Sequence, residues 1–139
     1  MRVVPDTNTL ISAIFWHGAP RLFLDRARQS EFELCTTVPL IQEFEDVLHR
    51  PTFAGRLMRL NATPTALTDA LAAWVTVVQP AHIPPVVLAD PDDDALFACA
   101  VAAHAKVVVS GDRHVLQIRT YRGITIMPVH ELLRRGARQ

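Results

Sequence analysis

Cysteine is scarce in this 139-residue sequence, which contains only Cys35 and Cys99. Both lie among apolar neighbours and neither belongs to a CxxC pair, so we expect buried, reduced thiols rather than a disulfide or a metal site. Half of the residues (50%) are hydrophobic, which is enough for one core without covalent or metal support. The composition therefore predicts one domain over residues 1–139.

Long apolar runs are also lacking. No stretch approaches the ~20 apolar residues that a membrane-spanning helix needs. Asp6 interrupts the N-terminal apolar residues too early for the hydrophobic part of a signal peptide. We therefore expect a soluble, cytoplasmic protein with no membrane partner.

A net charge is absent as well, since 14 basic residues balance 14 acidic ones, and Lys106 is the only lysine. The charges are nevertheless segregated. Residues 90–112 contain five aspartates and one lysine, whereas residues 113–139 contain six arginines and one glutamate. Because the planar guanidinium group matches phosphate oxygens, this arrangement suits a ligand with a phosphate backbone. A GC-rich genome would explain the preference for arginine equally well.

Short β-rich runs alternate with segments of helical periodicity. We expect strands over residues 2–5, 32–35, 75–78, 106–110 and 123–127. We expect helices over residues 10–15, 20–28, 38–48, 53–60, 64–74 and 93–104, a short helix before the last strand, and a terminal helix from Pro128. This order predicts a three-layer α/β/α domain around a mostly parallel central sheet. The working site of such a sheet lies at the carboxyl ends of its strands.

Acidic residues follow this map closely. Asp6 comes just after the first strand, and Asp112 just after the buried strand over residues 106–110. Glu43 lies one turn into the helix that follows the second strand. Four more aspartates occur in the segment LADPDDDALF over residues 88–97, at the start of the helix that leads to the buried strand. Carboxylates gathered at one sheet edge would repel one another unless a cation joined them, and hard oxygen ligands suit Mg²⁺ or Mn²⁺.

Each acid also has a purely structural explanation. Asp92 or Asp93 could cap the following helix, and Asp112 could cap a turn or helix after Gly111. Glu43 could lie on a solvated helix face. One helix needs only one cap, however, so capping does not explain four clustered aspartates. An acid placed directly after an apolar strand, as Asp6 is, is costly unless it is used.

Four segments resemble, in order, the motifs of PIN-domain ribonucleases: DTNTLISA over 6–13, LIQEFEDVLHRP over 40–51, DPDDD over 90–94 and VVSGDR over 108–113. The resemblance covers nearly the whole chain and is strongest to bacterial VapC-like toxins of toxin–antitoxin pairs. It implies a metal-dependent endoribonuclease. It also implies a cognate antitoxin protein and a homodimer as partners.

The resemblance also assigns roles to residues. It implies that Mg²⁺ or Mn²⁺ is bound by four catalytic acids, namely Asp6, Glu43, Asp93 and Asp112. A shift of the third acid to Asp94 is possible. Supporting polar groups would be Thr7, Asn8 and Ser110. The family often has another acid where this chain has His114, which puts a second metal ion in question. The arginines nearest in sequence to the site are candidates for RNA contact: Arg113, Arg119 and Arg122.

Three other functions compete with this interpretation. The segment DTNT over residues 6–9 resembles the nucleophile loop of haloacid-dehalogenase phosphatases, but Asn8 stands where their acid/base aspartate would be. A receiver-like signalling domain would need a lysine after a late strand, whereas Lys106 precedes its strand. A PIN fold that has lost activity and acts as a binding module has only His114 in its favour. Apolar residues such as Leu57, Leu60, Leu67, Leu71 and Trp74 could form a dimer interface, although for most of them a core position is the better explanation.

Overall fold

The computed structural model describes residues 1–87, 90 and 93–136. Within them, six strands form one sheet in the order β3-β2-β1-β4-β6-β5. All neighbouring strands are parallel except β5 and β6, which form an antiparallel hairpin. The strands are β1 (Arg2–Pro5), β2 (Glu33–Thr36), β3 (Thr76–Val77), β4 (Val107–Val109), β5 (Thr120–Tyr121) and β6 (Ile124–Met127). The predicted mostly parallel sheet is confirmed.

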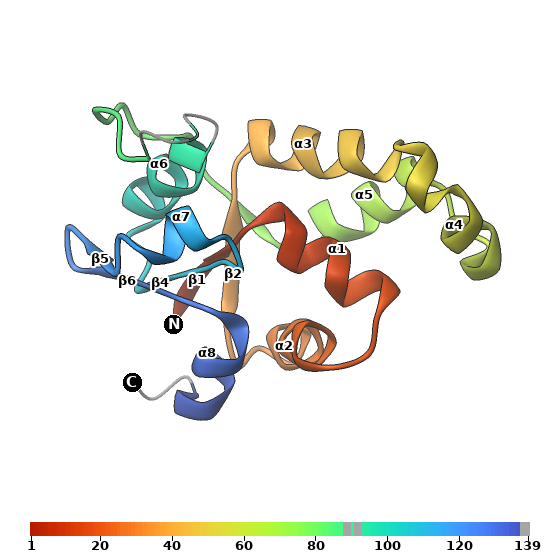
Figure 1. The fold of residues 1–139 in the computed structure, drawn as a ribbon, viewed down its shortest axis with the longest axis horizontal. Helices are drawn as coiled ribbons and strands as arrows, with labels where there is room; N and C mark the ends of the chain where they lie inside the picture. Colours follow the sequence, from red (N-terminus) through yellow and green to blue (C-terminus); the bar gives the residue numbers. More distant parts are fainter. Residues whose placement is uncertain (88–89, 91–92, 137–139) are drawn as a thin grey trace.

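Helices lie on both sides of this sheet (Figure 1). They are α1 (Thr7–Phe15), α2 (Ala19–Arg28), α3 (Val38–Leu48), the 3-10 turn η1 (Pro51–Phe53), α4 (Ala54–Leu60), α5 (Pro64–Ala72), α6 (Asp94–Ala103), α7 (Arg113–Leu116) and α8 (Val129–Arg135). Helices α6 and α7 lie on one side, and α1, α2, α3, α5 and α8 on the other. The three-layer α/β/α architecture is therefore also confirmed.

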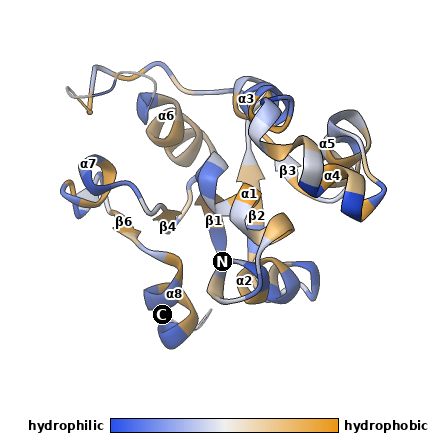
Figure 2. Cartoon of the chain, turned by 45° about the vertical axis from the view of Figure 1, so that its right-hand side comes forward, coloured by the Kyte–Doolittle hydropathy of each residue, from blue (hydrophilic) through white to orange (hydrophobic). Residues whose placement is uncertain are grey.

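Alternation along the strands builds two separate cores. Val3 packs with α1, α2 and α3, whereas its neighbour Val4 packs with α6. The same alternation places Val107 and Val109 in the first core and Val108 in the second. Successive strand residues point to opposite faces, so a continuous β-branched run fills both layers. Figure 2 shows α6 hydrophobic along most of its length, as expected for a helix that is buried on several sides.

Small differences from the predicted elements have local causes. Helix α1 begins at Thr7 rather than residue 10, because the Asp6 side chain accepts a hydrogen bond from the Thr9 amide and caps it. Strand β5 was not expected, since two residues are too short to show a pattern. Arg122 and Gly123 turn the chain between β5 and β6 with φ of 50° and 81°, the left-handed values that tight hairpins require.

The state of the two cysteines and the lengths of the helices can be read directly from the structure. Cys35 and Cys99 are buried and free, as predicted. Across the part of the chain that the structure describes, no helix is both long and apolar enough to cross a bilayer.

Parallel pairing of β1 with β4 is the feature that positions the site. Pro5 lies opposite Val109, and the Asp6 amide donates to the Val109 carbonyl at 2.9 Å. The residues that follow these two strands, Asp6 and Ser110, therefore lie side by side at the carboxyl edge of the sheet.

Candidate active site

A small cavity at this edge collects residues from four separate parts of the chain. Its lining comprises Asp6, Thr7, Asn8, Leu40, Glu43, Asp93, Leu96 and Asp112. The ends of β1 and β4 supply Asp6 and Asp112, while α3 supplies Glu43 and the start of α6 supplies Asp93. All four acids expected from the sequence thus face one space, together with Thr7 and Asn8. Their catalytic role stays a prediction.

Asp6 is held in place on both oxygens. Its Oδ1 accepts from the Thr9 amide at 2.8 Å, and its Oδ2 accepts from the Ser110 hydroxyl at 2.7 Å. Ser110 Oγ in turn accepts from the Asp112 amide at 3.0 Å. Because Asp6 is 7% exposed and Ser110 is 1% exposed, this network orients the carboxylate without much competition from water.

Asp112 combines two roles. Its Oδ1 accepts from the amides of His114 at 2.7 Å and Val115 at 3.4 Å, so it caps α7. The capping explanation is therefore correct for this residue, yet the same side chain also lines the acidic cavity. A cap of this kind uses one carboxylate oxygen and fixes the direction of the other.

Asp93 has a buried carboxylate oxygen that lacks a hydrogen-bond partner among the described residues. It occupies the N-cap position of α6, but its side chain makes no capping hydrogen bond. Its Oδ2 is buried and accepts no hydrogen bond from any residue that the structure describes. Burial raises its pKa to about 6, with further contributions from the negative charges of Asp112, Asp90, Asp6 and Glu43. Capping does not explain such a carboxylate, whereas a cation would compensate it.

Asp94 performs a different task. Its Oδ1 accepts from the amides of Val86 at 2.9 Å and Val87 at 2.7 Å, and so ties the preceding loop to the start of α6. Asp94 does not line the acidic cavity, whereas Asp93 does. This arrangement supports Asp93 over Asp94 as the third acid. The alternative cap, Asp92, lies outside the described residues.

The candidate arginines are not brought together. Arg113 is exposed and directly follows Asp112 at the start of α7. Arg122 instead lines another cavity with His104 and Lys106, beside the amino end of β4. Its guanidinium lies 5.2 Å from the centre of the Tyr121 ring. Arg113 therefore remains the nearest candidate for phosphate contact, and Arg122 lies at the opposite edge of the sheet.

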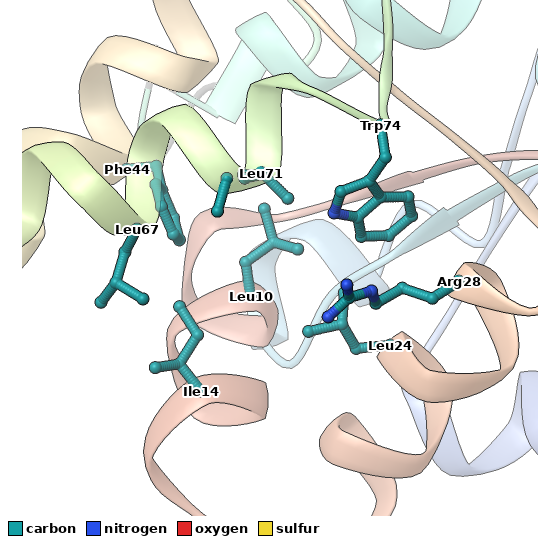
Figure 3. Close-up of a pocket in the computed structure, with 9 residues that line it drawn as sticks. Leu10, Ile14, Leu24, Arg28, Phe44, Leu67, Leu71 and Trp74 are labelled. Atoms are coloured by element: carbon teal, nitrogen blue, oxygen red, sulfur yellow. The ribbon is translucent and has the colours of Figure 1, made fainter. Parts of the chain in front are cut away.

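Most of the apolar residues considered for a dimer interface belong to the core side of the molecule. Leu57 and Leu71 are each 8% exposed. Leu67, Leu71 and Trp74 point into an apolar cavity together with Leu10 and Ile14 of α1 (Figure 3). Leu60 is an exception, with 49% exposure. The structure thus supports the core interpretation for most of this group.

The donor set fits a hard divalent cation, because carboxylate oxygens are the ligands that Mg²⁺ and Mn²⁺ prefer. The buried, unsatisfied Oδ2 of Asp93 supports the same conclusion. Within residues 1–87, 90 and 93–136, however, no three His, Cys, Asp or Glu side chains already stand in position to hold an ion.

Sequence reasoning missed two features of the site. The resemblance named Ser110 as a supporting polar group, but it did not show that the Ser110 hydroxyl links Asp6 to the Asp112 amide. It also did not find the apolar walls formed by Leu40 and Leu96, because both residues read as ordinary members of helix stripes.

Comparison with known proteins identifies a sequence family. The sequence family described as a PIN domain matches residues 2–114 of the 139 residues, a range that contains all four acids. No curated protein matches the chain. PIN domains are typically metal-dependent nucleases. The order of the strands, the acids at their carboxyl ends and this match together show that the chain belongs to the PIN-domain family.

Proposed function

We propose that this protein is a Mg²⁺- or Mn²⁺-dependent endoribonuclease that hydrolyses RNA phosphodiester bonds. The observation that carries the proposal is the gathering of Asp6, Glu43, Asp93 and Asp112 around one cavity. One of these acids keeps a buried oxygen without a hydrogen bond from the described residues. The family match supports nuclease activity in general.

Each of the four acids has a proposed role in binding the metal ion. Asp6 and Asp112, fixed by Ser110 and by the caps of α1 and α7, would hold the principal ion. Asp93 and Glu43 would complete its surroundings directly or through water. When bound, a divalent ion makes a water nucleophilic and neutralises charge on the phosphate. No protein nucleophile is needed, because the activated water would be the nucleophile. Both oxygens of Asp6 accept hydrogen bonds that hold this carboxylate in place.

The proposed substrate is single-stranded or looped RNA held by its backbone. Arg113 is exposed and directly follows Asp112 in the chain, so we take it as the candidate for phosphate contact. Rim cations of this kind offset the repulsion between a phosphate and a carboxylate cluster.

The resemblance to VapC-like toxins supports a role as the toxin of a toxin–antitoxin pair. The proposed partners are a cognate antitoxin protein and a second copy of the chain. The family match removes the haloacid-dehalogenase and receiver alternatives. A catalytically weakened binding module is disfavoured by the presence of all four acids around the cavity.

The test is cleavage of total RNA by the purified protein with Mn²⁺ or Mg²⁺ and with EDTA, followed by mapping of the RNA ends. We expect metal-dependent internal cleavage that the Asp6→Asn variant lacks. Asp69→Asn removes the same charge from an exposed position on α5 and serves as the matched control. Cleavage that persists in EDTA, or in Asp6→Asn, would contradict the proposal.

A further inference from the structure

An aromatic and cationic surface lies at the end of α1 that is remote from the acidic cavity. Trp16, the C-cap of α1, is 42% exposed. Arg56 places its guanidinium carbon 4.3 Å from the centre of the indole ring. The Phe15 ring packs edge-on against the indole, with 6.0 Å between the ring centres. Phe15 also stacks on Phe53, with 5.2 Å between the ring centres. These four residues, called here the Trp16 platform, hold the indole in a fixed orientation while much of it stays in water.

The two sequence segments that contain the residues of the Trp16 platform carry no negative charge. Residues 9–24 and 47–68 contain four arginines and two histidines but no aspartate or glutamate, although the whole chain is neutral. Arg21 caps α1 by donating to the carbonyls of Ala13 and Ile14. Arg50, Arg56 and Arg59 form no ion pair with any other residue in the described ranges. Unpaired arginines beside fixed aromatic rings are the usual surface for single-stranded nucleic acid.

Helix α1 connects this surface to the acidic cavity. Asn8 lies in the first turn of α1, and Trp16 follows its last residue as the C-cap, with an extended backbone. Asn8 lines the acidic cavity and Trp16 ends the helix, so about 12 Å of helix axis separates them. A nucleic-acid strand advances at least about 3.4 Å per nucleotide and more when extended, so this distance corresponds to roughly two to four nucleotides. Figure 1 shows α1 leading away from β1 toward the region of α4.

We propose that the Trp16 platform stacks an unpaired base of single-stranded RNA about two to four nucleotides from the phosphate at the acidic cavity. The proposal rests on the proposed nuclease function, because it places the platform on the same substrate. RNA is favoured over an apolar protein partner by charge. An apolar protein surface would leave Arg50, Arg56 and Arg59 without counter-charge, whereas a phosphate backbone supplies it.

The experiment measures binding of fluorescently labelled octauridylate in EDTA, so that no metal-dependent cleavage occurs. The variants are Trp16→Ala, Trp16→Phe and, as the matched control, Met58→Ala, which truncates a side chain that is 81% exposed on α4. We expect Trp16→Ala to weaken binding about 5- to 30-fold, Trp16→Phe to restore most of the affinity, and Met58→Ala to bind like the wild type.

A second readout keeps the test independent of folding defects. In a Trp74→Phe background Trp16 is the only tryptophan, and octauridylate should quench its fluorescence. Wild-type protein that does not bind octauridylate, or equal affinity in Trp16→Ala, would overturn the proposal. A change of oligomeric state in Trp16→Ala with unaltered RNA affinity would overturn it too, because the surface would then be a protein contact.

The two proposals can fail separately. RNA cleavage by wild type together with unchanged binding in Trp16→Ala would refute the platform and leave the nuclease function intact. Stacking on Trp16 without any metal-dependent cleavage would support the platform and refute the nuclease function.

Discussion

Replacing Asp93 by asparagine should stabilise the metal-free protein at neutral pH. Asp93 Oδ2 is buried and accepts no hydrogen bond from the described residues, and the pKa of this carboxyl is raised from 3.8 to about 6. The native state therefore binds this proton more tightly than the unfolded chain does. Ionised Asp93 thus lowers native stability fully above pH 6, less between pH 6 and 3.8, and not at all below that range.

The expected gain in the free energy of unfolding can be calculated from the shift in the pKa of Asp93. Two pKa units correspond to at most about 3 kcal/mol, at 1.36 kcal/mol per unit. Asp93 is only half-buried, so solvent screening reduces the expected gain to about 1–2 kcal/mol. For a domain of this size that gain raises the melting temperature by about 3–7 °C.

The assay is thermal unfolding of wild type and Asp93→Asn in EDTA at pH 7.5 and pH 4.5. We expect the gain at pH 7.5 to fall to about half or less at pH 4.5, where the native wild-type carboxyl is already protonated. Asp69→Asn, on the exposed face of α5, should change stability by less than about 0.5 kcal/mol at either pH. With Mn²⁺ at pH 7.5 the wild type should have the higher melting temperature of the two proteins, since only the wild type keeps all four acids. An unchanged or lower melting temperature for metal-free Asp93→Asn, or a gain independent of pH, would refute the reasoning.

Other predictions address the remaining contacts of the site. Asp6→Asn should abolish metal-dependent RNA cleavage while circular dichroism shows an intact fold; undiminished cleavage would remove Asp6 from the site. Titration of Mn²⁺ should raise the melting temperature of wild type by an amount that grows with ion concentration, and a flat response would mean that the acids serve only as caps. Ser110→Ala should cost about 1–3 kcal/mol of stability in urea unfolding, because it leaves Asp6 Oδ2 without its partner, and should lower RNA cleavage more than Asp69→Asn does. Asp94→Ala should cost a similar amount by freeing the Val86 and Val87 amides, whereas equal stability would show that this loop needs no anchor.

The sequence by itself determined the α/β architecture and pointed to the candidate acids. A continuous run such as Val107–Val109 can only be buried on both faces, and helices must then cover each side. Acids placed directly after such strands necessarily meet at one edge of a parallel sheet.

Only the tertiary structure decided which member of the aspartate cluster faces the cavity. Asp93 and Asp94 are adjacent and chemically identical, so the resemblance preferred Asp93 but left a shift to Asp94 open. The loop over residues 86–87 folds back onto Asp94 and satisfies it with two amides, which leaves Asp93 buried and turned toward the other acids. Likewise, Trp16 meets Arg56 across 40 residues of sequence. Contacts of this kind depend on how helices pack against one another, and that information is distributed over the whole chain rather than contained in any segment.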